Sequence, residues 1–513
     1  MEENKMSKGK EILAILLLTM VIGTGTLAWI VWSSKDNTNM NVTIGDLADV
    51  SFKTGNDINI SNLSPSFYYD DGALTEFSIR KKKGLTTELN TNIYLDITSI
   101  SDELKNDNFK YVLLSSSDGN TYNEVISSSF KDASVGKLSI VTDSSLTDGK
   151  TYYKFYIWID GNNENNETMQ GKSLKGTLNV EVSTPPVNAV TLVEGLDKGE
   201  TGDSGSGVYK VTHSAIASGS SATGSEIPAV TDYRYYGPSP NNYICLDMED
   251  ASTCPDKHLY KIIGSIYEEK ENTNRLKVIK ATPLTDGTTS KFSWDYKVNN
   301  GSGSYDNIWA TITSGNYSNS LTSGSQLMKL LNSGAWWNGT SGSYYNNSTT
   351  ATTVNFTNYK LSDKAKSYIT TSRYYLGGYN NNTPLTNEMY GYERGTLRYN
   401  TDRPLYWEGM VGLMYPSDYG YAAGNTCVTE TKLFDYDGGC KIKDWLYISN
   451  TYQWLMSPGS GDSGRVFNVN SSGYVNNGHI SNNVYSVSPV FYLNSSASIS
   501  SGDGTSAAPY ILS

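Results

Sequence analysis

Histidine, cysteine and positive charge are all scarce in this sequence. The 513 residues include three histidines and four cysteines, and no two cysteines have CxxC spacing. Histidine and cysteine are the usual ligands of structural zinc, so these counts argue against a zinc site. The formal net charge is −12. This charge argues against nucleic acid or an anionic membrane surface as an electrostatic partner.

Long amphipathic helices are scarce too, whereas turn-forming and strand-forming residues are abundant. The chain has 47 glycines and 39 tyrosines beside many Ser, Thr and Asn residues, which is typical of many short strands and turns. Only 325–331 and 361–369 have a clear helical pattern, and Ser362 is placed to cap the second of these helices. We therefore expect a mainly β protein with a few helices, in the α+β class.

Residues 1–33 have the pattern of an export segment. Lys5, Lys8 and Lys10 precede an apolar run from Ile12 to Trp32. One alternative is a signal peptide cleaved after Ala28, and the other is an uncleaved N-terminal helix that anchors the chain in a membrane. Both alternatives place the rest of the chain outside the cytoplasm, either on the cell surface or secreted.

Residues 41–184 alternate between apolar and polar side chains, as half-buried strands do. Ile93, Leu95 and Ile97 show this pattern, and 152–159 form a nearly continuous β-prone run that suits a central strand. Strands at this spacing, separated by Asp-Gly turns, predict a β-sandwich domain. Residues 185–230 are rich in Gly and Ser and are expected to form a linker or junction, before a C-terminal domain over 231–513.

The four cysteines form two pairs that are close in the sequence. In an oxidising compartment Cys245 would bond to Cys254 and Cys427 to Cys440. Each bridge would then stabilise the fold by roughly 3 kcal/mol through chain entropy. Other pairings and free thiols remain alternatives at this point.

The stretch 452–493 combines apolar runs with polar residues that are typical of recognition surfaces. Short runs around 454–456, 466–469 and 484–493 predict strands with one face in the core and one face in solvent. Asn, Ser, Tyr and His on the outer face would suit binding, because such side chains form adaptable hydrogen bonds. The candidate ligand-binding residues are Arg465, Asn468, Asn470, Tyr474, Asn476, Asn477, His479 and Tyr485.

Motifs for catalysis and for metal binding are weak. Gly-Asp-Ser-Gly at 461–464 and at 202–205 matches the nucleophile signature of trypsin-like proteases, but no histidine lies in the context of that family. We therefore expect no enzymatic activity. Calcium is an alternative small ligand, with clustered oxygens at 160–164 and 435–438, although neither segment matches a full EF-hand loop and no cofactor is required.

Two regions resemble known families of exported bacterial proteins. GTGTLAWIV, NMNVTIGDL and the segment from YIWIDGNN to LNVEVS resemble the camelysin/TasA family of matrix proteins. That resemblance implies a β-sandwich and, in some members, assembly into fibres. The series VGLMYPSDYGYA, WLMSPG, VSPVFYL and GDGTSAAPYIL resembles an uncharacterised family of exported Bacillota surface proteins. The second resemblance implies a C-type-lectin-like domain over most of 231–513.

One position departs from the pattern of the second family. Its last strand usually reads Val-Arg-Pro-Val, whereas this chain has Ser488 in place of the arginine. Any ion pair made by that arginine is therefore absent here.

These patterns favour a recognition or adhesion protein that presents a lectin-like domain on a β-sandwich stalk. The expected partner is a glycan or a protein at the cell surface, with membrane contact through 1–33 if that segment is not cleaved. The alternative is a structural role, in which the sandwich polymerises into matrix fibres by strand addition.

Overall fold

A computed structural model describes residues 40–513, except 45–46, 54, 86–87, 163–165, 250, 296–307, 311, 314–315, 318–323, 347, 349, 402 and 481–482. The predicted export segment 1–33 therefore lies outside the described residues. Within them, no helix has both the length and the apolar character needed to cross a bilayer. The chain divides after Pro185 into two compact units, each with its own core.

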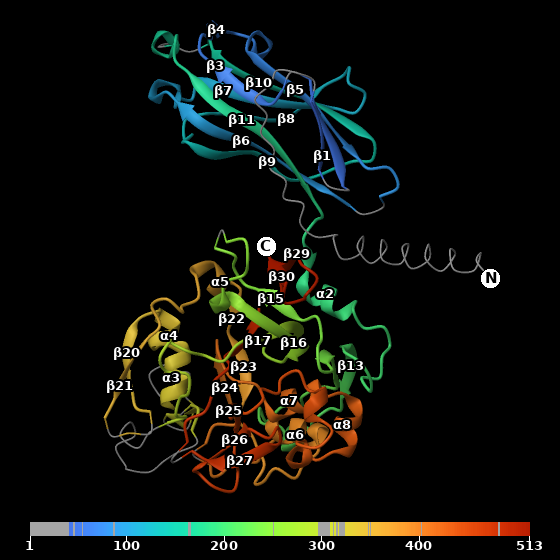
Figure 1. Ribbon diagram of the computed structural model, residues 1–513, viewed down its shortest axis with the longest axis vertical. Helices are drawn as coiled ribbons and strands as arrows, with labels where there is room; N and C mark the ends of the chain where they lie inside the picture. The colour runs from blue at the N-terminus through green and yellow to red at the C-terminus, as the bar shows by residue number, and fades with distance from the viewer. Residues whose placement is uncertain are drawn as a thin grey trace, which may run out of the picture. The chain divides into compact units, whose positions relative to one another are not determined.

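The first unit consists of two β-sheets that share one hydrophobic core. The larger sheet has the order β1-β2-β5-β10-β7-β8, with β4 paired to β10 (Figure 1). Its strands are β1 (Met40–Ile44), β2 (Ala48–Phe52), β4 (Pro65–Ser66), β5 (Ala73–Lys81), β7 (Phe109–Ser116), β8 (Asn123–Ser129) and β10 (Lys150–Asp160). The smaller sheet, in the order β3-β11-β6-β9, contains β3 (Asp57–Ile60), β6 (Asn90–Ile100), β9 (Gly136–Ser145) and β11 (Leu174–Ser183). This arrangement fits the predicted β-sandwich.

Alternation along the strands builds the core of the first unit. Phe155 and Ile157 of β10 point inward and are almost completely buried, as are Leu95 of β6 and Leu178 of β11. The sequence prediction of a central strand at 152–159 is confirmed, because β10 pairs with β5 on one side and β7 on the other. Three short 3-10 helices complete this unit, namely η1 (Tyr69–Asp71), η2 (Asp102–Leu104) and η3 (Asn166–Met169).

A ten-stranded sheet runs through the second unit. Its main path is β12-β29-β30-β15-β16-β17-β28-β22, and β14 joins β16 to β13 at the side. These strands are β12 (Val187–Asn188), β13 (Gly207–His213), β14 (Val230–Tyr236), β15 (Tyr243–Cys245), β16 (Leu259–Glu268), β17 (Thr273–Lys280), β22 (Ile369–Thr370), β28 (Val490–Leu493), β29 (Ser498–Ser501) and β30 (Tyr510–Leu512). β16 and β17 pair as an antiparallel hairpin.

Smaller sheets and helices surround this sheet. The smaller sheets are β18 (Ile312–Thr313) with β19 (Asn316–Tyr317), β20 (Ser341–Tyr344) with β21 (Thr352–Asn355), β23 (Ser372–Tyr375) with β24 (Tyr406–Gly409), and the three-stranded sheet of β25 (Gln453–Pro458), β26 (Arg465–Val469) and β27 (Val475–His479). The α-helices are α2 (Ala189–Glu194), α3 (Gln326–Asn332), α4 (Ala335–Asn338), α5 (Asp363–Ser367), α6 (Thr386–Glu393), α7 (Pro416–Ala422) and α8 (Asn425–Glu430). The remaining 3-10 helices are η4 (Ser218–Ser220), η5 (Asp256–His258), η6 (Leu433–Asp435) and η7 (Lys441–Lys443). Helices α6, α7 and α8 lie together, on the opposite side of this unit from α3 and α4 (Figure 1).

Both helices expected from the sequence are present, and both are capped. The Ser325 side chain accepts a hydrogen bond from Met328 N at the start of α3, and Ser362 accepts one from Ala365 N at the start of α5. The expectation of only two clear helices was wrong, because α6, α7 and α8 also form. Helix α7 is buried along its whole length, so it shows no polar face from which an amphipathic pattern could be recognised.

The prediction that 185–230 are a linker was wrong as well. These residues belong to the second unit, where α2 begins after Asn188 and β13 pairs with β14. Val208 and Tyr209 of β13 are buried. The strand was missed because the segment as a whole is rich in Gly and Ser. That composition is typical of loops, and it outweighs the short apolar run that forms β13.

Both predicted disulfides are present in the second unit. Cys245 is bonded to Cys254 and Cys427 to Cys440, and the described residues include no free cysteine. The first bridge joins β15 to the segment before η5, and the second joins α8 to the start of η7. Each bridge holds a region that has little regular structure of its own.

Large aromatic side chains fill the core of the second unit. The buried tryptophans include Trp294, Trp309, Trp336, Trp407 and Trp454. Just before β28, the Gln453 amide donates a hydrogen bond to Ser488 Oγ over 2.9 Å, and both residues are buried. Ser488 is therefore part of a neutral hydrogen-bonded pair.

Candidate functional site

The predicted recognition stretch folds into the three-stranded sheet of β25, β26 and β27. The pairing places Arg465 directly opposite His479 at one end of β26. The loop before β26 carries Asp462, and the sheet continues to the pair Val469 and Val475 at its other end. Strand pairing therefore decides which of the predicted residues come together.

Asp462, Arg465 and His479 form a charged cluster at the first end. Asp462 Oδ2 lies 3.4 Å from Arg465 Nε and 3.8 Å from His479 Nε2. The Arg465 guanidinium also donates from Nη1 to the backbone oxygen of Asn477 over 2.8 Å. The side chains stay 39 %, 39 % and 52 % exposed, in the order Asp462, Arg465 and His479. The charged cluster is therefore both fixed in position and open to solvent.

Backbone geometry keeps the carboxylate of this cluster ionised. The Gly464 N–H donates to Asp462 Oδ1 over 2.8 Å. This hydrogen bond lowers the pKa of the Asp462 carboxyl, and the nearby His479 and Arg465 lower it further. The ionised carboxylate in turn accepts a hydrogen bond from the Arg465 guanidinium, and the His479 imidazole lies beside it at 3.8 Å. These two groups offer hydrogen-bond donors that match carboxylate, phosphate or hydroxyl oxygens of a partner.

Three predicted binding residues do not face solvent, which corrects the expectation of an outward polar face. Asn468, Asn470 and Asn477 are 0 %, 5 % and 5 % exposed. Asn470 Oδ1 accepts the backbone N–H groups of 472, 473 and 474, so it caps the turn between β26 and β27. Asn477 donates to the backbone oxygen of Asn380, in a loop that covers β27. Alternation in a strand predicts two faces, but only tertiary packing decides whether either face meets solvent.

The remaining candidates lie apart from the charged cluster. Tyr474, Asn476 and Tyr485 are half-buried, and the Tyr485 ring packs against Trp454 at 4.3 Å and Tyr452 at 4.9 Å. Tyr485 lies near the start of β25, whereas Arg465 is opposite the end of that strand. Four residues along a strand separate these ends by about 13 Å. The predicted residues therefore form two groups and not one site.

The Gly-Asp-Ser-Gly motif at 461–464 contributes Asp462 to the charged cluster. A serine nucleophile needs a hydrogen bond to an imidazole base. No such bond joins Ser463 to His479 among the described residues. In the second copy of the motif, Asp203 accepts hydrogen bonds from Thr426 N and Oγ1 at the start of α8. Asp203 thus holds a loop to a helix.

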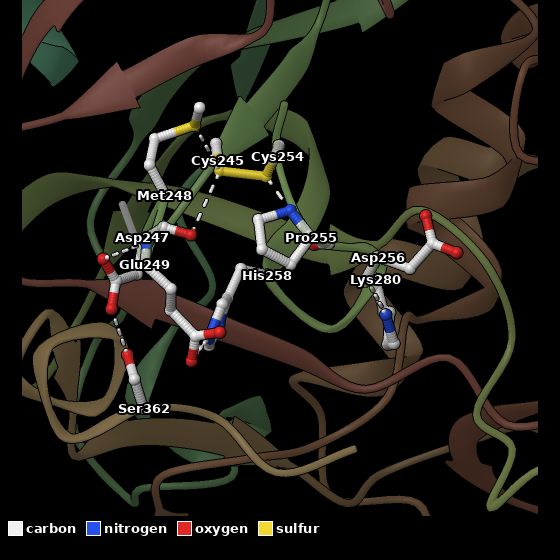
Figure 2. Close-up of a disulfide and its surroundings, with 10 residues drawn as sticks. All are labelled: Cys245, Asp247, Met248, Glu249, Cys254, Pro255, Asp256, His258, Lys280 and Ser362. Carbon is white, nitrogen blue, oxygen red and sulfur yellow. Dashed lines mark hydrogen bonds and ion pairs between the residues drawn. A yellow bond between two sulfur atoms is a disulfide. The ribbon is translucent and has the colours of Figure 1, made fainter. Parts of the chain in front are cut away.

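A second group of ionisable side chains lies beside the first disulfide and was not predicted from the sequence. Asp247, Glu249 and His258 place one potential ligand atom each within 4.8 Å of the others. Figure 2 shows His258 behind Glu249, whose carboxylate Oε1 lies 3.0 Å from the imidazole Nε2. Burial lowers the pKa of His258. Two acidic residues and one histidine in a chain this polar gave no pattern that could single them out.

The contacts of this group already balance its charges. Lys257 Nζ lies 2.8 Å from Glu249, and Ser362 donates to Asp247 over 2.6 Å (Figure 2 shows the serine). The ammonium group next to Glu249 would repel a cation. His258 Nδ1 has no hydrogen-bond partner in the described part of the chain, whereas metal-bound histidines donate from their second nitrogen. The group therefore fits an internal ion pair better than a metal centre.

Of the two candidate calcium segments, 160–164 is described in part and 435–438 is described completely. Asp160 in the first accepts from Lys110 Nζ over 2.6 Å and from the Asn162 side chain over 2.8 Å, so a cation already neutralises it. Residues 163–164 of that segment lie outside the described residues. In the second segment, Asp435 and Asp437 are exposed. Calcium binding stays a prediction at both places.

The most strongly perturbed ionisable groups form a buried network in the second unit. Arg234 contacts Asp418 at 3.0 Å and Asp232 at 2.7 Å, and the Asp232 carboxylate accepts a hydrogen bond from His213 Nε2 over 2.9 Å. Lys277 Nζ lies 2.5 Å from the other oxygen of Asp418. Perturbed groups often mark active sites, but these side chains are shielded from solvent on all sides. This network therefore holds the fold together.

No protein-family model matches the sequence, and a search of curated proteins finds no significant match.

Proposed function

We propose that this chain is an exported, non-catalytic recognition protein and that the charged cluster is part of the surface that contacts its partner. The observation that carries the proposal is the cluster itself, in which Asp462 holds the Arg465 guanidinium and lies 3.8 Å from His479, while His479 is exposed and the other two side chains are partly exposed. A guanidinium that is already oriented loses little conformational entropy on binding. The partner is a glycan or a protein with acidic or hydroxyl groups.

Three features support the rest of this proposal. The two disulfides suit an oxidising compartment outside the cytoplasm. The order of motifs from 411 to 512 supports a C-type-lectin-like fold for the second unit. The β-rich first unit is suited to act as a stalk, with the segment 1–33 as its export signal or anchor.

The proposal is tested by binding of the purified chain to glycan and protein arrays, with calcium and with a chelator. We expect a specific hit that weakens at least tenfold in the double variant Arg465→Ala, His479→Ala. The control variant is Arg80→Ala, which removes an exposed arginine at the end of β5. Binding that survives the double variant would exclude this surface. A blank array with folded protein would argue against recognition altogether.

A further inference from the structure

A hollow of about 380 Å³ lies at one end of the first unit and is lined by four aromatic and three polar residues. Phe67, Tyr68 and Tyr69 line it from the segment between β4 and η1, and Trp158 lines it from β10. Phe67 is 68 % exposed and Tyr68 is 70 % exposed. Large apolar rings gathered at one exposed place usually mark a binding site. The volume is at the lower end of the range for small-ligand pockets.

The backbone fixes the segment that carries these rings. β4 pairs with the end of β10, and Gly161 N donates to the Ser66 oxygen over 2.8 Å. Ser66 Oγ accepts from Tyr68 N over 3.0 Å and donates to Asp71 over 2.5 Å. The backbone that carries the exposed rings is therefore held in position in the absence of a ligand, which reduces the entropy that this segment loses on binding.

A small apolar layer supports the hollow from below. Val112, Leu114, Tyr156 and Trp158 form a buried cluster on the face of the larger sheet that points away from the main core. The Tyr69 ring packs against Tyr156 at 5.2 Å and against Trp158 at 6.1 Å. These rings meet at 59° and 63°, so they pack edge to face as one wall. They do not form the facing rings that would surround a cationic group.

The polar groups around the hollow carry either a negative charge or almost no net charge. Lys110 neutralises Asp160, which also fixes Asn162 through its backbone and side-chain N–H groups. Asp70 adds an exposed carboxylate. This charge disfavours phosphate, and therefore a stacked nucleic acid. Carboxylate and amide groups beside flat rings suit a ligand that has hydroxyl groups and an apolar face.

We propose that this hollow binds a neutral saccharide. The apolar C–H face of a sugar ring would stack on Phe67 or Tyr68, while Asp70 and Asn162 would bond its hydroxyl groups. This site lies in the first unit and does not depend on the charged cluster of the second unit. The chain would then carry two binding sites of different chemistry.

Titration calorimetry of the full chain tests the proposal with four neutral oligosaccharides, namely the hexamers of glucose (β-1,4), N-acetylglucosamine, mannose and xylose. Choline chloride and inorganic phosphate are the comparison ligands. We expect at least one hexamer to bind, and the double variant Phe67→Ala, Tyr68→Ala to weaken it at least tenfold. Since both side chains are mostly exposed, this variant keeps the fold, which circular dichroism confirms.

The variant Tyr399→Ala is the matched control, since it removes an exposed tyrosine from the second unit. It should change the affinity less than twofold. Binding of no hexamer would overturn the proposal, as would a hexamer affinity unchanged in the double variant. Binding of choline or phosphate in preference to every hexamer would overturn the assignment to a neutral saccharide. The variant Arg465→Ala, His479→Ala should leave hexamer binding unchanged, which separates this test from that of the charged cluster.

Discussion

At the scale of single residues, the second unit is notable for charges that are buried but paired. Asp418 accepts from both Arg234 and Lys277, and Arg394 lies 3.5 Å from carboxylate oxygens of Glu269 and of Glu393. An isolated buried charge costs several kcal/mol, so each pair in this network depends on the others. Titration of any one member should therefore change stability.

Glu393 gives a prediction with a definite sign. Burial raises its pKa to about 7, against an ordinary value near 4.5, although Arg394 and Ser417 act in the opposite direction. The folded state therefore holds a proton that the unfolded state has released between these two pH values. Its contribution to stability is complete below about pH 4.5 and is lost as pH rises to about 7, a loss of about 3 kcal/mol at most.

The variant Glu393→Gln should remove this dependence. Between pH 5 and pH 8, the free energy of unfolding of the parent should fall by about 2 kcal/mol relative to that of the variant. Urea denaturation followed by tryptophan fluorescence measures it, since seven tryptophans lie in the second unit. The variant Glu430→Gln controls for the loss of one negative charge at an exposed position. A difference that stays constant with pH would contradict the prediction.

At the scale of elements, α6 and α7 pack closely because one position between them has no side chain. A Cβ added at Gly420 in α7 would lie 2.1 Å from Thr386 Oγ1 at the start of α6. Thr386 is itself held by a 2.8 Å hydrogen bond to the Tyr436 hydroxyl, so it has little freedom to move. Gly391 in α6 has no atom within 4 Å of such a Cβ.

These two glycines should respond to alanine in opposite ways. Gly420→Ala should destabilise the second unit by about 1–3 kcal/mol, because it forces a side chain into a packed contact. Gly391→Ala should stabilise it by about 0.5–1 kcal/mol, because alanine favours the helix and meets no neighbour. Urea midpoints measure both changes. If both variants shifted the urea midpoint in the same direction, the packing of α6 on α7 would not be the cause of the stability changes.

At the scale of the whole molecule, both disulfides belong to one of the two units. Each unit has a separate core, and the first unit contains no cysteine. The bridges close short loops, with sequence separations of 9 and 13. Their contribution to stability therefore concerns the second unit alone, at roughly 3 kcal/mol for each bridge.

Reduction of the disulfides should accordingly affect the two units differently. Hydrogen exchange with and without dithiothreitol should show lost protection in peptides from β15 and α8. Peptides from β6 and β11 should keep theirs, because their hydrogen bonds depend only on the first core. The quadruple Cys→Ala variant without reductant should give the same pattern. An equal loss of protection in both units would contradict their independence.

Several features were predictable because their causes are local in the sequence. Alternation in 93–97 and 152–159 follows from the two faces of a strand, and both segments became strands at the expected positions. Ser362 was expected to cap its helix and does so, because a hydroxyl can reach a backbone N–H three residues ahead. The disulfides were also predictable, since cysteines close in the chain meet readily once a turn brings them together.

By itself, the sequence determined the β-rich class, the strands at 93–97 and 152–159 and the helix cap at Ser362, and it favoured the disulfide pairs that form. Only the tertiary structure decided that Asn468 and Asn477 are buried, and Asn477 contacts a loop that is 97 residues away in the sequence. It also decided that β13 belongs to the second unit and that Arg465 meets His479 across a strand pair. Periodicity describes one segment and its two faces. Exposure and proximity depend on what packs against that segment, which is a property of the whole fold.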